Sequence, residues 1–347
     1  MNDTEPGAGG LRNEYFSRLA RLQRPQHPAA AEVAPGERDE IIQWCASMGF
    51  FPHDSERAKL ARQIDIPLWT TLCLPEVSPP GRALINRWWA WGMVWEMLFD
   101  SYREESFDGF LEETGNALQA CLAGEPPTGN TSPFIGGLHE MFKEIEQKHG
   151  RVWRSRLSEN LLGSFHGDLT EKFSSHRHAI PSFEIYCAQR VYTYGQWYVT
   201  EIAVMEMGLD PCAKFWQHPI TKKANELTML HGGLVNDLCS LDRDLSLGKT
   251  HNAVIIKQQE GLSLQDAILE VTDLCNRTVR TILDMESMML SYSDSVLGVQ
   301  EARQVATLFG ILRTLMRGTI DWYHQSPRYT AWQPGEFSDD APFPSSQ

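Results

Sequence analysis

Apolar residues recur at helical spacing along most of the chain. From Asp39 onward, Ile41, Trp44, Cys45 and Met48 repeat every three or four residues. No stretch shows the convincing alternation of apolar and polar residues that marks a half-buried strand. The pattern therefore predicts an all-α fold, a bundle of helices. Beyond this first helix, the pattern predicts helices at residues 58–63, 81–105, 135–157, 160–173, 181 to about 195, 267–290 and 300–323. A further helix is predicted around residues 235–244, which follow an apolar run.

Proline- and glycine-rich segments separate these predicted helices. Pro67 breaks the first helical region, and further prolines at 75, 79 and 80 mark a loop before the helix at 81–105. Residues 123–134 form a second predicted loop because they are rich in Gly and Pro. Pro181 is expected in the first turn of its helix, where its missing N–H costs nothing.

The length favours one domain with two tails. The 347 residues, 42% of them hydrophobic, can bury one large core, and an all-helical domain of this size need not divide. Residues 1–38 are too poor in core-forming side chains to fold by themselves, and we expect a flexible N-terminal tail there. A flexible C-terminal tail is expected at 331–347, which leaves a single helical domain at 39–330.

Charge and cysteine content narrow the class of protein. A formal net charge of -14 argues against nucleic acid and against stable association with an anionic membrane. Seven scattered cysteines, odd in number and never in a C-x-x-C pair, indicate neither disulfides nor zinc, so they are expected to be core thiols in a reducing compartment. No apolar run suits a transmembrane span or a signal peptide, so a cytoplasmic protein is expected. The oligomeric state stays open, with a homodimer among the alternatives.

Three oxygen-bearing side chains share one face of the helix expected around 235–244. Asn236, Ser240 and Asp244 stand at i, i+4 and i+8, so each lies only about 40° around the helix from the one before. Hard oxygen donors in such a row suit Mg²⁺, which keeps further sites for water and substrate phosphate. Arg243 falls near the same face and can meet the charge of that phosphate. The alternative, a solvated surface, fits poorly because the residues before the motif are apolar.

A second acidic row follows a helix that is apolar nearly all round. Trp88 to Phe99 are almost wholly apolar, which indicates burial among other helices. Glu96, Asp100 and Glu104 then stand at i, i+4 and i+8, so a continuous helix would place them on one face. Without other support, such a row is an ordinary solvated helix end.

Together these stretches resemble the class I terpene synthases. Residues 236–244 are similar to that family's second metal motif, N-D-x-x-S-x-x-x-E, with Asp244 in place of the commoner Glu. The family's aspartate-rich motif matches in a degenerate form, with Asp100 first, Ser101 second, and Glu104 and Glu105 as the distal acids.

Two further matches extend the resemblance to about two-thirds of the chain. Arg190 lies in an R-x-x-T-x-G context, 46 residues before Asn236, and resembles the family's diphosphate sensor. Arg328 and Tyr329 resemble its C-terminal Arg-Tyr pair, another diphosphate donor.

The resemblance implies a single α-helical bundle with a central cavity and an enzyme that ionises a linear prenyl diphosphate. Three Mg²⁺ ions, or Mn²⁺ in their place, would be held by Asp100, Glu104, Asn236, Ser240 and Asp244. Arg190, Arg243, Arg328 and Tyr329 would bind the diphosphate. Cyclisation of the carbocation would follow against a wall of apolar and aromatic side chains, with the candidates Met93, Met97, Phe99, Tyr194, Trp197 and Trp322.

Farnesyl diphosphate is the default substrate, and geranylgeranyl diphosphate is the first alternative. The Asn/Ser/Asp motif argues against a chain-elongating prenyltransferase, which would need two D-D-x-x-D motifs. The departure at Ser101 keeps open a homologue that binds a prenyl diphosphate without turning it over.

Overall fold

The fold is helical wherever the chain is described. The computed structural model describes residue 19 and residues 32–101, 104–125, 132–176 and 179–330, without the side chains of 99–113 and 175–176. Every regular element in these residues is a helix, which confirms the predicted all-α fold. The elements are α2 (Glu37–Ser47), α3 (Glu56–Ile64), α4 (Ile66–Cys73), α5 (Pro79–Ser101), α6 (Glu104–Ala123), α7 (Pro133–His149), α8 (Arg151–His176), α9 (Phe183–Thr193), α10 (Trp197–Glu206), the 3-10 helix η1 (Lys214–Gln217), α11 (Pro219–Ser246), α12 (Ala253–Gln259), α13 (Leu264–Tyr292), the π-helical segment η2 (Ser293–Leu297), α14 (Val299–Gln325) and α15 (Pro327–Thr330).

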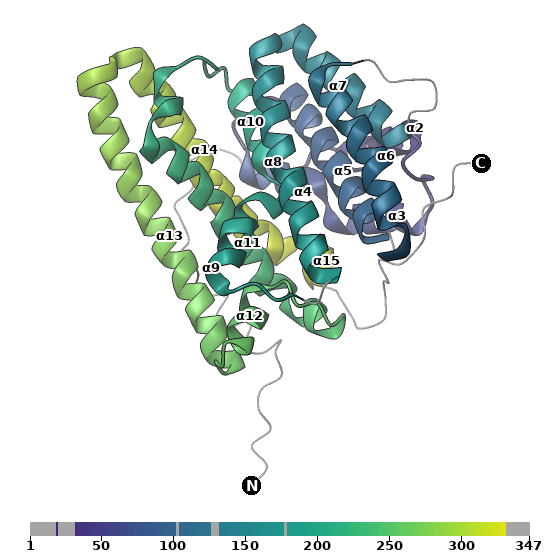
Figure 1. The fold of residues 1–347 in the computed structure, drawn as a ribbon. Coiled ribbons are helices and arrows are strands. Elements are labelled where there is room, and N and C mark those ends of the chain that lie inside the picture. Colours follow the sequence, from purple (N-terminus) through teal and green to yellow (C-terminus); the bar gives the residue numbers. More distant parts are fainter. Residues whose placement is uncertain (1–18, 20–31, 102–103, 126–131, 177–178, 331–347) are drawn as a thin grey trace.

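Helix α11 lies in the middle of the bundle. It packs on α13, α9, α14 and α12, while α8 packs on α9 and α10, and α5 packs on α4, α10 and α7. Figure 1 shows the long helices side by side, with α13 at one edge and α6 and α7 towards the other. Helices α10 and α14, which pack on each other, therefore link the tryptophan-rich helix α5 to the motif helix α11.

Asp65 separates two helices at the predicted break. It ends α3 with a left-handed φ of 55° and begins α4, where its carboxylate accepts from Leu68 N at 3.3 Å. Arg38 of α2 binds the same carboxylate at 2.9 Å. Pro67 lies in the first turn of α4, where it needs no hydrogen-bond partner. The break therefore falls two residues before the proline.

The helix predicted at 81–105 is wrong as one continuous element. The structure has α5 up to Ser101 and a separate helix, α6, from Glu104. The periodicity argument for Glu104 fails with it, because residues in different helices share no common face. The side chains of Asp100 and Glu104 lie outside the described part of the structure.

Two other predicted boundaries are wrong. The division expected near residue 158 falls at Gly150, whose φ of 87° ends α7 in a conformation that favours glycine. The first turn of α9 begins after Ser182, whose side chain accepts from Ile185 N at 3.4 Å, so Pro181 precedes the cap instead of occupying the first turn.

The predicted tails lie almost wholly outside the described residues. The exceptions are Leu19, which is buried in the core, and the stretch from 32 that leads into α2. None of the described helices combines the length and the hydropathy that a membrane span requires.

Candidate active site

A cavity of about 130 Å³ opens between α5, α9, α10, α11 and α14. We refer to it as the main cavity. Its wall carries a set of charged and polar groups, which we call the polar side, and a set of aromatic rings, which we call the aromatic side. The polar side includes Arg190, Asn236, Arg243, Arg328 and Tyr329, and the aromatic side includes Trp69, Trp89, Tyr194, Trp322 and Tyr323.

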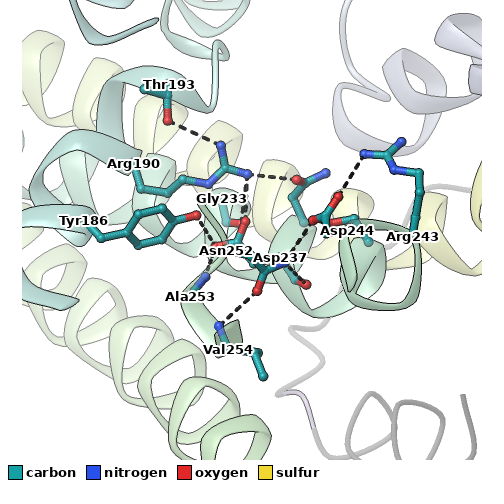
Figure 2. Close-up of polar contacts among 12 residues, drawn as sticks. Tyr186, Arg190, Thr193, Gly233, Asp237, Arg243, Asp244, Asn252, Ala253 and Val254 are labelled. Atoms are coloured by element: carbon teal, nitrogen blue, oxygen red, sulfur yellow. Dashed lines mark hydrogen bonds and ion pairs between the residues drawn. The ribbon is translucent and has the colours of Figure 1, made fainter. Parts of the chain in front are cut away.

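The predicted metal-binding face of α11 is closely hydrogen-bonded at its C-terminal end. Ser240 Oγ donates to Asp244 Oδ2 at 2.6 Å, and Asn252 Nδ2 donates to the same oxygen at 3.0 Å. Arg243 Nη2 lies 3.6 Å from Asp244 Oδ1 (Figure 2). Ser240 and Asp244 are buried, whereas Asn236 and Arg243 line the main cavity.

Asn236 joins three helices at one amide. Arg190 Nη2 of α9 donates to Asn236 Oδ1 at 2.8 Å. The amide nitrogen donates to Tyr323 Oη of α14 at 2.7 Å and to Tyr329 Oη of α15 at 3.4 Å. The structure thus brings together three predicted site residues, Arg190, Asn236 and Tyr329, that are far apart in the sequence.

Asp237 anchors Arg190, and the sequence pattern assigned it no role. Arg190 Nη2 lies 2.9 Å from Asp237 Oδ1, while Tyr186 Oη and Ala253 N donate to Asp237 Oδ2 at 2.6 and 3.2 Å. Figure 2 shows Tyr186, Arg190 and Ala253 converging on Asp237. Asp237 follows Asn236 by about 100° around α11. It therefore lies within about 20° of Asp244, seven residues later on the helix, and this nearness to the motif is the signal that could have found it.

Charge balance fixes the ionisation of this pair. Only 2% of Asp237 is exposed, and burial raises its pKa to about 6 against the opposing effects of Arg190 and Tyr186. Burial alone would lower the pKa of Arg190, but the neighbouring Asp237 and Tyr186 raise it well above its ordinary value. The guanidinium therefore stays charged in its buried position.

Two arginines each have a side-chain N–H donor that can bind a ligand. Among the described residues, neither Arg190 Nε nor Arg328 Nε has a hydrogen-bond acceptor, although both atoms are buried. A buried cationic donor without an acceptor is costly unless an anion binds it. Gly233 allows Arg190 to pass over α11, since a Cβ at that position would lie 2.7 Å from Arg190 Cγ. The arrangement suits an anionic ligand at the polar side of the cavity.

The aromatic side of the main cavity is a connected set of rings. Trp69 stacks on Trp89 with 5.5 Å between centroids, and Trp89 meets the edge of Trp322 at 5.6 Å. Trp322 in turn lies 5.3 Å from the ring of Tyr329, which belongs to the polar side. Since aromatic faces carry negative quadrupole density, these rings can stabilise a cation beside the anion site.

The predicted wall residues divide into three groups. Met93, Tyr194 and Trp322 line the main cavity. Met97 packs half-buried against the core, and the ring of Trp197 stacks on Tyr192 while its Nε1 donates to Val191 O at 2.7 Å. The side chain of Phe99 lies outside the described residues.

Of the three residues in the predicted acidic row, Glu96 is the one whose side chain the structure describes. It lines the main cavity one turn before Asp100 and is exposed. The side chains of Asp100, Ser101, Glu104 and Glu105 lie outside the described residues, so their relation to the cavity remains a prediction.

The chemistry of the α11 donors fits magnesium. Amide, hydroxyl and carboxylate oxygens are hard ligands, and Asn236 Oδ1 keeps a second lone pair while it accepts from Arg190. Among the described residues no three His, Cys, Asp or Glu side chains form a metal cluster. The motif's donor set therefore favours a hard cation over zinc.

Known proteins resemble the chain over most of its length. Residues 87–281 match the family model described as terpene synthase family 2, C-terminal metal binding. The chain is 23% identical over 343 residues to isoafricanol synthase of Streptomyces violaceusniger, covering 90% of this chain and 85% of that protein. It is 20% identical to the 7-epi-alpha-eudesmol synthase of Streptomyces viridochromogenes, described as (2E,6E)-farnesyl diphosphate cyclizing, over 91% of this chain and 93% of that one.

A solved structure shows the same fold. The crystal structure of an α-eudesmol synthase superposes with a TM-score of 0.76 at 18% identity and covers 88% of this chain and 99% of its own. The family model spans more than half of the chain and includes both Arg190 and the α11 motif. On this evidence the chain belongs to the class I terpene synthase family and is an enzyme of that family.

Proposed function

We propose that this enzyme ionises farnesyl diphosphate and cyclises the resulting carbocation, with release of pyrophosphate. The observation that carries the proposal is the composition of the main cavity. Three arginines and the amide of Asn236 line the main cavity together with Trp89 and Trp322. An anion and a cation generated from one substrate could thus be stabilised within the same space.

The polar side would bind the diphosphate. A unit charge pair at 4 Å contributes about 4 kcal/mol at an effective dielectric near 20. Arg190 is already held in place by Asp237, so little ordering remains to be done when the diphosphate arrives. Arg328 and Arg243 would add charge, and Tyr329 a hydroxyl donor, from α15 and α11.

The motif side chains Asn236, Ser240 and Asp244 would hold Mg²⁺, with Asp100 and Glu104 as ligands from the other acidic motif. Three ions are proposed, and Mn²⁺ would serve in their place. Bound there, the metal supplies positive charge that compensates the leaving diphosphate. The matched family model, described as metal binding, supports a divalent cation.

The aromatic side would protect the carbocation. Ring faces stabilise a cation by about 0.5–2 kcal/mol each, and they offer no lone pair strong enough to trap it at once. The relative described as cyclizing (2E,6E)-farnesyl diphosphate supports this substrate. Geranylgeranyl diphosphate is the alternative.

The test is incubation with the C10, C15, C20 and C25 prenyl diphosphates and Mg²⁺, followed by pyrophosphate assay and mass analysis of the extract. We expect cyclic C15 products, and no turnover after exhaustive chelation. A protein that binds these compounds tightly and releases no pyrophosphate would be a non-catalytic homologue. Turnover that survives chelation would overturn the metal-dependent mechanism.

A further inference from the structure

A second, smaller space lies beside the main cavity. It measures about 20 Å³, room for little more than one water molecule, and we refer to it as the side chamber. Its wall is largely apolar and comes from α5, α6 and α8. The residues that distinguish it from the main cavity include Trp91, Trp95, Leu118, Leu161 and Phe165.

One large buried side chain lies between the two spaces. The main cavity and the side chamber share Gly92, Glu96, Thr193, Gly195 and Tyr198 in their walls. Two of these are glycines, Thr193 is short, and Glu96 is exposed. Tyr198, in the first turn of α10, is only 6% exposed and is the residue whose ring can separate the spaces.

Tyr198 rests on a glycine that it requires. A Cβ at Gly92 would overlap the Tyr198 hydroxyl and lie 3.0 Å from its Cζ. The ring also packs 6.2 Å from Trp88, one turn earlier in α5. Gly92, which we call the glycine seat, and Trp88 together position the ring of Tyr198 against α5.

The side chamber could accept hydrocarbon if the ring were absent. Its walls are mostly aromatic and aliphatic, and of its two carboxyl groups Glu96 is shared with the main cavity, while Asp168 accepts from Trp95 Nε1 at 2.8 Å. Burial raises the pKa of Asp168 well above its ordinary value, so this group opposes an apolar chain less than a free carboxylate would. Because the chamber itself is small, most of the new space would be that vacated by Tyr198.

We propose that Tyr198, seated on Gly92, determines substrate chain length by closing the main cavity off from the side chamber. The proposal rests on the proposed function, since it assumes that a prenyl chain occupies the main cavity. With the ring in place the cavity ends at Tyr198 and suits the shorter chain. Removal of the ring joins the two spaces and admits one more isoprene unit.

The test compares the wild type with Tyr198→Ala, Tyr198→Leu and Tyr198→Phe on C15 and C20 diphosphates, using pyrophosphate release. Tyr198→Ala should raise the C20-to-C15 ratio of kcat/KM by at least about tenfold, the scale on which a pocket distinguishes small differences in apolar size. Tyr198→Leu should shift it less, and Tyr198→Phe should keep it within about twofold because the ring remains. Tyr292→Ala, on the distant helix α13, serves as the control and should leave both rates unchanged.

Binding of unreactive C15 and C20 thiolodiphosphates, followed by thermal shift, separates this proposal from the function itself. If the wild type released no pyrophosphate from any substrate, the proposed function would fail. A thermal shift with the C20 thiolodiphosphate that is seen for Tyr198→Ala and not for the wild type would still support the role of Tyr198 in separating the two spaces. Folded Ala and Leu variants with the wild-type ratio and the wild-type pattern of shifts would overturn it.

Discussion

The two ends of the active-site region are held in place by different forces. Around Arg190, charged and polar groups bind one another, and Asp237 alone forms an ion pair with Arg190 and accepts hydrogen bonds from Tyr186 and Ala253, partners that lie on two helices. Around Tyr198, the arrangement depends on ring packing against Trp88 and on the absence of a side chain at Gly92. The first region is specified by charge and hydrogen bonding, and the second by shape.

The difference predicts opposite sensitivities. At the charged end, substitutions that keep size but change charge or donor geometry should be the most damaging. At the aromatic end, substitutions that change volume should matter, whereas loss of a hydroxyl should matter little.

Arg190→Lys should lower the rate of pyrophosphate release by about 10²–10³-fold, the usual loss for one preorganised donor to a developing anion. Lysine keeps the charge but lacks the planar fork that reaches both Asn236 and Asp237. Steady-state kinetics provide the measurement. Arg82→Lys in the first turn of α5 is the matched control and should retain the wild-type rate. A fully active Arg190→Lys enzyme would remove this residue from the diphosphate site.

Asp237→Asn should lower the free energy of unfolding by ~3 kcal/mol, because it leaves the buried guanidinium of Arg190 without its counter-charge. Urea unfolding followed by circular dichroism measures this. Asp284→Asn, on an exposed position of α13, should change stability by less than ~0.5 kcal/mol. Equal effects of the two substitutions would mean that the ion pair contributes nothing specific.

His231 adds a pH-dependent term to the polar helix α11. It is buried, and burial lowers its pKa to about 4 from an ordinary value of 6.5. Below pH 6.5 the unfolded chain takes up a proton that the folded chain refuses, so stability from this group is complete above pH 6.5 and is lost as pH falls towards 4. Asp237, with its raised pKa, acts in the opposite direction.

The contribution of His231 is therefore best measured as a difference between proteins. Between pH 7.5 and pH 4.5 the wild type should lose ~3 kcal/mol more unfolding free energy than His231→Met, which cannot take up a proton. Urea unfolding of both proteins at both pH values gives the four unfolding free energies that this comparison needs. Parallel pH profiles for the two proteins would show that His231 is not buried in its neutral form.

Gly92→Ala should cost ~2 kcal/mol of stability despite the better helix propensity of alanine, because its Cβ overlaps the Tyr198 hydroxyl. Tyr198→Phe in the same chain should recover part of the loss, and only part, since Cζ would still be 3.0 Å from the new Cβ. Tyr198→Phe alone should cost less than ~1 kcal/mol. A double-mutant cycle measures the coupling, and additive effects would disprove the glycine seat.

Sequence reasoning was most successful where one helix carries the whole pattern. Asn236, Ser240 and Asp244 lie within three turns of α11, so their spacing alone places them on a common face. Local periodicity also gave the all-α fold. It does not carry over to Glu104, because a face argument needs an unbroken helix and α5 ends at Ser101, so the role of Glu104 stays a prediction.

The remaining features depend on pairings that spacing does not encode. Tyr198 meets Gly92 although the two are 106 positions apart in the chain, and Tyr186 meets Asp237 from another helix. Such contacts follow from the packing of α5 on α10 and of α9 on α11. A single sequence carries no periodic signal for them.

Glycines within helices limit how this enzyme can be made more heat-resistant. Replacing a helical glycine by alanine ordinarily adds ~1 kcal/mol of stability. At Gly232 and Gly318 a methyl group would instead overlap the ring of Tyr194 and the backbone at Leu72. At Gly136 and Gly310 it would meet no described atom within 4 Å. Stabilising substitutions are thus available at Gly136 of α7 and at Gly310 of α14, while Gly232 and Gly318 must remain glycine.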